Sequence, residues 1–169
     1  NLEIWAKTIF SVYRYLPKLA SSIDKIVELK AVSANNISGV YFSSNDTLNI
    51  TNSLIELTER KVALINLKVL AEKILKSIDK KEAKILILRF MDNFTMEKIG
   101  EMLDTSARTI YRKVNEGLKS SSAVLSVMGY NIKKLEEMTS GEKWIRQLCE
   151  EYERKNDIII TASKLKDIC

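Results

Sequence analysis

Apolar residues recur at helical spacing along most of the chain. Near the N-terminus they lie three or four residues apart, as on one face of a helix, at Leu2, Trp5, Ile9, Val12, Tyr13 and Leu16. Pro17 interrupts this stripe, and since proline is tolerated in a first helical turn, a second helix is predicted from there to about Ala34. The pattern therefore predicts a helical hairpin over residues 1–34.

Residues 35–46 are rich in Asn, Ser and Gly and predict a loop, which Tyr41 and Phe42 are expected to hold against the core. Residues 47–78 contain neither Gly nor Pro and predict one long connecting helix of about 47 Å. Two apolar rows repeat every seven residues along it: Leu48, Ile55, Val62 and Val69, and Leu57, Leu64, Ala71 and Ile78. Two interpretations stay open, the spine of a helical bundle and a dimer-forming coiled coil.

Residues 79–120 predict three short helices in succession. Asp79, Thr95 and Ser106 each precede an amphipathic stretch and are N-cap residue types. The predicted helices end near residues 91, 103 and 120. Residues 121–169 form a C-terminal segment with a Ser cluster, Gly129 and a helical stretch over about 140–155.

Composition narrows the fold and the chemistry. One Pro and five Gly in 169 residues favour an all-α chain over a β-sandwich or barrel. With no His, the chain has no His-dependent triad and no His-ligated zinc site, and its two Cys fit a reducing cytoplasm. The sequence predicts no catalytic residue, cofactor or metal. No apolar run is long enough for a membrane span, and the N-terminal residues lack the pattern of a signal peptide.

Residues 95–120 meet the physical demands of a helix-turn-helix. Gly100 stands where the two helices must approach closely, although glycine costs up to ~1 kcal/mol of helix propensity. Asp104 stands in the turn, where a residue that tolerates positive φ is needed. The shared core is predicted at Ile99, Leu103, Ile110 and Val114. The net charge of +5 only permits nucleic acid, but residues 105–119 carry four basic side chains and one acidic side chain.

The stretch from residue 79 to 120 resembles region 4 of the bacterial sigma-70 family, the module that binds promoter −35 elements. Residues 82–90 resemble its leading helix, which ends in Leu-Arg-aromatic. Residues 95–100 resemble the T-x-x-E-I-A start of the first motif helix, and residues 106–114 resemble the S-x-x-T-V-x-x-R start of the recognition helix. Gly100, Asp104 and Lys113 depart from the usual Ala, Gly and Arg. No counterpart of region 2 is found, and the order of elements looks similar to small Firmicute and phage regulators of the ArpU type.

This resemblance implies a DNA-binding transcriptional regulator whose recognition helix enters the major groove. Arg108 and Arg112 are the candidates for base contacts, and Lys113 and Lys119 for phosphate contacts. The full set of expected DNA-binding residues is Thr95, Lys98, Ser106, Ala107, Arg108, Tyr111, Arg112, Lys113, Asn115 and Lys119.

Two hypotheses remain after the sequence alone. In the first, the protein is a sequence-specific regulator that binds double-stranded DNA, with a homodimer formed through the long helix or the N-terminal hairpin. In the second, the same fold contacts RNA polymerase or a sigma factor and has little DNA affinity of its own. An enzyme is not supported, because the chain has no Gly-rich phosphate loop and no nucleophile–base pair.

Overall fold

The computed structural model describes residues 1–36 and 44–166, with side chains described for 1–33 and 46–156, and within these residues every regular element is helical. The predicted placement of Tyr41 and Phe42 lies outside the described residues. No described helix is long and apolar enough to cross a membrane. The elements in chain order are α1 (Leu2–Tyr13), α2 (Leu16–Asn36), α3 (Ser44–Ser77), α4 (Lys80–Leu86), the π-helix η1 (Ile87–Met91), α5 (Met96–Met102), α6 (Ala107–Val127), α7 (Ile132–Met138) and α8 (Lys143–Lys166).

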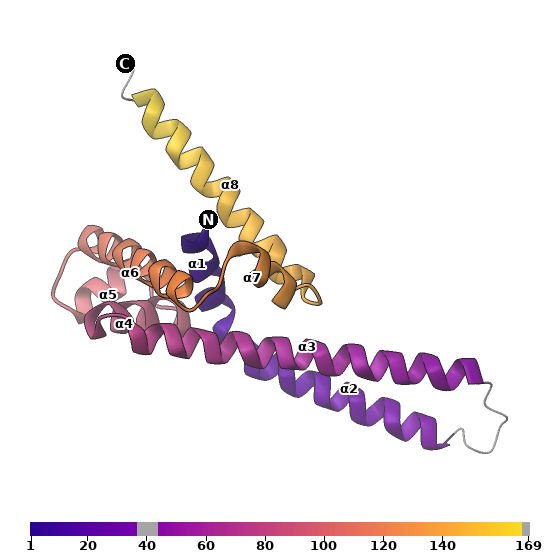
Figure 1. Cartoon of the computed structure of the whole chain (residues 1–169). Helices are drawn as coiled ribbons and strands as arrows, with labels where there is room; N and C mark the ends of the chain where they lie inside the picture. The colour runs from indigo at the N-terminus through magenta and orange to yellow at the C-terminus, as the bar shows by residue number, and fades with distance from the viewer. Residues whose placement is uncertain (37–43, 167–169) are drawn as a thin grey trace.

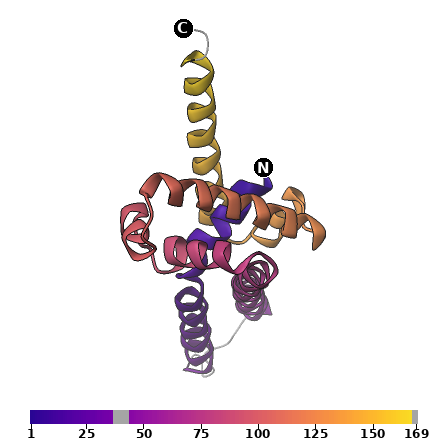
Figure 2. The same ribbon diagram turned by 90° about the vertical axis from the view of Figure 1, so that its left-hand side faces the viewer.

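The first helix, α1, lies at the centre of the molecule. It packs against α6, α8, α3 and η1, and Figure 2 shows α6 lying across the molecule with α1 behind it. Ile9 and Phe10 are fully buried there, and the Phe10 and Phe90 rings lie 6.2 Å apart between centroids. The hydroxyl of Tyr13 donates to Glu72 Oε1 at 2.9 Å and joins α1 to α3. Residues distant in sequence thus build one core.

The predicted N-terminal hairpin of residues 1–34 is wrong. The two helices exist, with a break at the predicted place, but α2 packs along α3 and hardly touches α1 (Figure 1). Lys61 Nζ lies 2.6 Å from Asp24 Oδ1, and Lys30 also bonds Ser53 between the same two helices. Only Arg14 and Tyr15 connect the two helices. On one side of this connection α1 packs in the core, and on the other α2 packs along α3. We call α2 and α3 together the arm.

The long helix α3 separates its two apolar rows. Leu57, Leu64 and Ala71 are buried and Ile78 is partly buried. The other row stays exposed within the chain, with fractional exposures of 59% at Leu48, 52% at Ile55, 49% at Val62 and 41% at Val69. One row is therefore part of the core, and the other stays about half exposed to solvent.

The helix that follows the turn is longer than predicted. α6 runs to Val127 rather than ending near residue 120. The Ser cluster does not stop it, because Ser121 is buried and returns its hydroxyl to Gly117 O at 2.7 Å. Gly129, at φ 77°, ends the helix, and Tyr130 N donates to Leu125 O at 3.0 Å, as in a Schellman motif.

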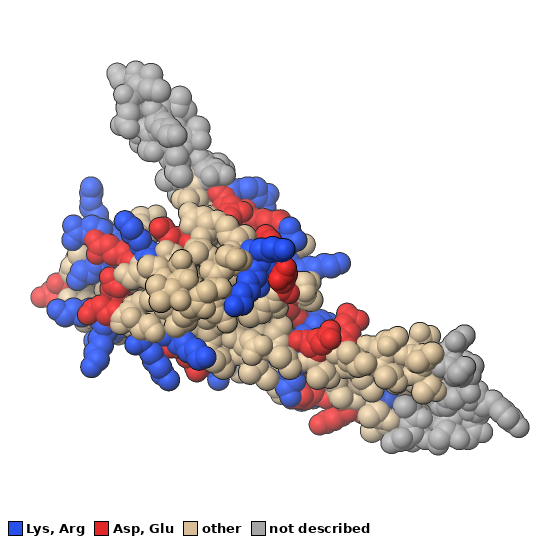
Figure 3. Space-filling model, in the orientation of Figure 1, with Lys and Arg blue, Asp and Glu red and all other residues tan. Residues whose placement is uncertain are grey.

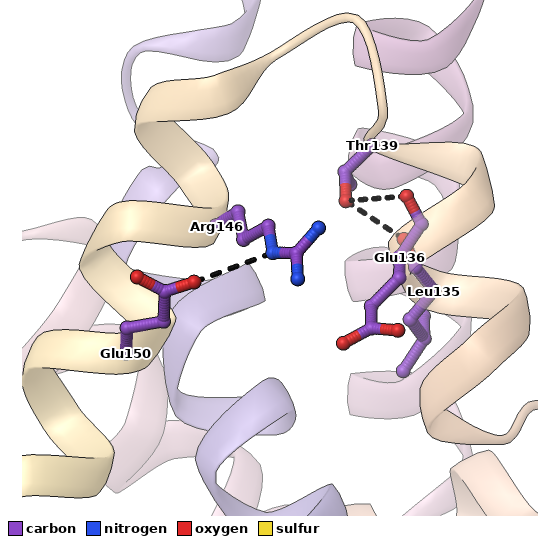
Figure 4. A network of polar contacts seen from close by, with 5 residues as sticks. All are labelled: Leu135, Glu136, Thr139, Arg146 and Glu150. Atoms are coloured by element: carbon purple, nitrogen blue, oxygen red, sulfur yellow. Dashed lines mark hydrogen bonds and ion pairs between the residues drawn. The ribbon is translucent and has the colours of Figure 1, made fainter.

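The C-terminal segment is fastened to the arm through a buried carboxylate. Glu142 is 3% exposed and accepts hydrogen bonds from Arg60 Nε at 2.8 Å and from Trp144 Nε1 at 2.7 Å. Figure 4 shows the neighbouring junction of α7 and α8, where buried Thr139 bonds Leu135 O at 2.8 Å and Arg146 pairs with Glu150. The sequence analysis predicted a helix only over about 140–155 and missed α7, although Asn131 is an N-cap residue type and its side chain accepts from Lys134 N at 2.8 Å.

Candidate nucleic-acid interface

The turn between α5 and α6 is fixed at both ends by side-chain caps. Thr95 Oγ1 accepts from Lys98 N at 3.2 Å, and Ser106 Oγ accepts from Thr109 N at 3.1 Å. Both caps stand where the sequence placed them, and each satisfies a backbone N–H that the first helical turn leaves free. The caps therefore set where each helix begins.

Gly100 allows the turn to close on α5. Thr105 N donates to Gly100 O at 2.9 Å, and a Cβ built on Gly100 would lie 2.6 Å from Thr105 O. No flexible side chain absorbs that clash, because the opposing atom belongs to the backbone. Asp104 adopts φ 48° within the turn, which is the left-handed conformation that the sequence required of it. The close approach predicted for this glycine is confirmed.

The predicted shared core of the two helices is also confirmed. Ile99 and Ile110 are fully buried, Val114 is 3% exposed, and Leu103 is partly buried. Farther along α6, a Cβ added to Gly117 would lie 3.2 Å from the side chain of Leu86, so α4 packs closely there. These contacts hold the inner face of α6 and leave the outer face to solvent.

Three basic side chains share the outer face of α6. Arg108, Arg112 and Lys119 are exposed and lie on one side of the helix by their 3.6-residue spacing. Arg112 Nε lies 3.6 Å from Glu116 Oε1, with both side chains more than half exposed. Such exposed pairs contribute at most about 1 kcal/mol, so Arg112 remains available to a ligand.

The other predicted residues take different positions around this face. Tyr111 and Asn115 line a cleft between α6, α1 and α8. Ser106 and Ala107 line a shallow hollow at the turn, together with Glu97, Glu101 and Asp104. Lys113 is partly buried, and Lys98, exposed on α5, lies 3.1 Å from Glu101 Oε2 and stands where the family pattern has glutamate.

Sequence reasoning missed the basic residues that other helices bring to α6. Lys7 on α1, Arg14 directly after α1 and Lys155 on α8 line the same cleft as Tyr111. Their separation in the sequence concealed the cluster, although Lys7, Ser11 and Arg14 have the spacing of one helix face. That polar face of an otherwise apolar helix was the available signal.

Charge is concentrated around the helix-turn-helix. Figure 3 shows Lys and Arg side chains projecting over the end of the molecule formed by α4, α5 and α6, with acidic side chains between them. The described residues contain no group of three or more acidic or thiol side chains that could hold a metal ion.

Comparison with known families adds one finding. The family model for sigma-70, region 4 matches residues 74–120, which is less than a third of the chain and begins inside the last turns of α3. Comparison with curated proteins and with solved structures found no match. The matched residues contain the two caps, the close Gly100 approach and the exposed basic face described above. Residues 74–120 are therefore a sigma-70 region 4-like helix-turn-helix, a DNA-binding fold.

Proposed function

We propose that this protein is a sequence-specific DNA-binding transcriptional regulator, whose outer face of α6 binds in the major groove. The observation that carries the proposal is the exposed side of α6 with Arg108, Arg112 and Lys119, held outward by a tightly closed turn. Arginine can bond a guanine edge through two N–H groups, so Arg108 and Arg112 are assigned to base contacts. Lys119 and Lys113 are assigned to phosphates.

The remaining predicted residues have supporting roles in this proposal. Ser106 is exposed at the N-terminus of α6, where backbone N–H groups favour an anion such as a DNA phosphate. Thr95 and Lys98 are assigned to the flanking DNA backbone from the start of α5. Asn115 and Tyr111 stand between the outer face and the cleft, and Ala107 stands at the turn. The likeness to ArpU-type regulators stays a prediction.

The helix-turn-helix is proposed to act in pairs. Leu48, Ile55, Val62 and Val69 repeat every seven residues on α3 and are all more than 40% exposed. A second copy of the chain, presenting the same row, fits this spacing, as in a coiled coil. A homodimer would also present two recognition helices to two half-sites.

Chromatin capture of the tagged protein in its native host, followed by fluorescence anisotropy on the recovered site, tests the assignment to DNA. The double variant Arg108→Ala/Arg112→Ala is expected to weaken binding by about a hundredfold, because each good arginine–guanine contact contributes about 1–3 kcal/mol. The charge-matched control Lys25→Ala/Lys143→Ala, with both changes away from α6, should retain affinity. Unchanged affinity and salt dependence in the α6 variant would show that the recognition helix is wrongly assigned.

A second function is supported by the hollow at the turn. Glu97, Glu101 and Asp104 line it, and a carboxylate-rich surface suits a basic protein partner better than DNA. Here the protein would contact RNA polymerase or a sigma factor. Co-purification with polymerase, without retention on DNA and without a shared motif among the captured sites, would favour this function over the first.

A further inference from the structure

A cleft lies between the recognition helix and the two terminal helices. Its volume is about 510 Å³, which is within the range of small-molecule sites. α1, α6 and α8 form its sides, and residues from η1 and the segment before α5 complete it. The lining includes four basic residues: Lys7, Arg14, Arg89 and Lys155.

The cleft has no acidic residue among its described lining residues, although acids make up 22 of the chain's 169 residues. The pKa of Lys7 is lowered, first because the amine is partly buried and then because Lys155 and Arg89 lie near it. Close cations without a carboxylate between them repel one another, and an anion placed among them relieves that repulsion. The cleft is therefore electrostatically prepared for negative charge.

The positive charge of two of these basic residues is partly compensated by groups that do not line the cleft. Lys155 Nζ lies 2.6 Å from Glu151 Oε1, and Arg89 Nη1 donates to Phe94 O at 2.8 Å. A second cleft of about 430 Å³ shares Lys7, Lys155 and Tyr111 with the first, and there Glu3 is among the lining residues. The acid-free part is thus the side toward Arg14 and Arg89.

Lys7 on α1 and Arg14 directly after it lie over aromatic rings rather than beside carboxylates. Lys7 Nζ lies 4.2 Å from the centroid of the Tyr152 ring, and the Arg14 guanidinium lies 4.8 Å from that of Tyr15. The Tyr152 hydroxyl in turn bonds Ser11 Oγ at 3.1 Å. Rings position the cations without cancelling their charge, so their hydrogen-bond donors stay free for a ligand.

We propose that this cleft binds the phosphate group of an anionic ligand beside the recognition helix. Lys7 and Arg14 supply the charged donors, and Asn115 and Tyr111 of α6 supply neutral ones. The phosphate comes either from a small phosphorylated molecule, for which the volume is sufficient, or from the backbone of bound DNA. Binding of a small molecule does not depend on the proposed function, whereas the DNA arm rests on it.

The test is a titration of the full chain with pyrophosphate, in which binding is measured by calorimetry and by NMR of the α6 backbone amides. Saturable binding with shifts at Tyr111 and Asn115 is expected. The variant Lys7→Gln/Arg14→Gln keeps most of each side-chain stem and should weaken binding by at least about tenfold, because it removes two charged hydrogen-bond donors. The matched control Lys25→Gln/Lys143→Gln removes the same charge elsewhere and should bind as the unaltered chain does. Thermal melts check that all variants fold.

The same variants are then titrated with the DNA site at several salt concentrations. If pyrophosphate does not bind but the cleft variant lowers the salt slope by about two relative to the control, the phosphate belongs to DNA and the proposal stands. If neither ligand distinguishes the cleft variant from the control, the proposal is overturned. The variant Arg108→Ala/Arg112→Ala separates the two proposals, because it should lose DNA affinity and still bind pyrophosphate.

Discussion

The helix-turn-helix and the arm are both helical, but they differ in how far they bury their apolar side chains. In the helix-turn-helix, Ile99, Ile110 and Val114 are buried between helices that are neighbours in the sequence. In the arm, only one of two apolar rows on α3 is buried, and Leu29 and Val32 of α2 are 68% and 55% exposed. On the face drawn in Figure 3, part of the arm shows mostly uncharged residues. The first unit buries its shared core within one chain, and the second leaves a row of apolar side chains about half exposed.

The largest expected effect on stability comes from a substitution at Gly100, in the helix-turn-helix. Gly100→Ala is expected to lower the free energy of unfolding by about 2–3 kcal/mol, because overpacking costs typically 1–3 kcal/mol and the new Cβ would lie 2.6 Å from a backbone carbonyl oxygen. Denaturant titration followed by circular dichroism measures this change. Gly117→Ala is the matched control, since its Cβ would meet the movable Leu86 side chain at 3.2 Å. Equal effects of the two substitutions would contradict the assigned role of the turn.

The next largest effect on stability is expected at the ion pair of Arg60 and Glu142, which links the arm to the C-terminal segment. Glu142 holds the pKa of the Arg60 guanidinium above its usual value by accepting its hydrogen bond. Arg60→Ala should lower the free energy of unfolding by about 1–2 kcal/mol. This is less than for a fully buried pair, because Arg60 is 36% exposed while Glu142 loses one of its two partners.

Arg146→Ala provides the control for Arg60→Ala. Arg146 and Glu150 form a pair in which both side chains are more than half exposed, so its loss should change the free energy of unfolding by less than about 0.5 kcal/mol (Figure 4). A comparable loss of stability in both variants would mean that burial of Glu142 does not distinguish the two pairs.

The parts of the fold that the sequence predicted are those set by neighbouring residues. The caps at Asp79, Thr95 and Ser106 each bond a backbone N–H two or three residues ahead, so residue type and spacing were sufficient to locate them. The positive φ of Asp104 and the close approach at Gly100 were found in the same way. All of these features concern contacts within about five residues.

Some of the missed features, such as α7 and the end of α6 at Gly129, are set locally. Others depend on contacts between distant residues. Periodicity identified α1 and α2 as helices but could not show that α2 packs on α3 while α1 enters the core. The cleft likewise joins Lys7, Tyr111 and Lys155, which are far apart in the chain. A helical stripe specifies which side is buried and leaves open which element buries it.

The smallest expected effect on stability is at the exposed apolar row of α3, and a substitution there can be compared directly with one in the buried row. Val62 is 49% exposed, so Val62→Lys should change the free energy of unfolding by less than about 0.5 kcal/mol. If a second copy covers this row, the same change buries a charge at the interface, and sedimentation at micromolar concentration should show a dimer become a monomer. Leu64→Lys, at a buried position two residues away, should instead destabilise the fold itself.

The outcome at Val62 decides what the two apolar rows mean. A dimer that survives Val62→Lys would place the interface elsewhere on the molecule. If the unaltered chain is already a monomer, the exposed row that repeats every seven residues on α3 is not a dimer interface. The repeat then reflects only a long helix whose other row is buried in the core. A dimer lost without loss of stability would establish that the arm pairs two chains, and DNA affinity should then fall as well, because the two recognition helices would no longer bind as one unit.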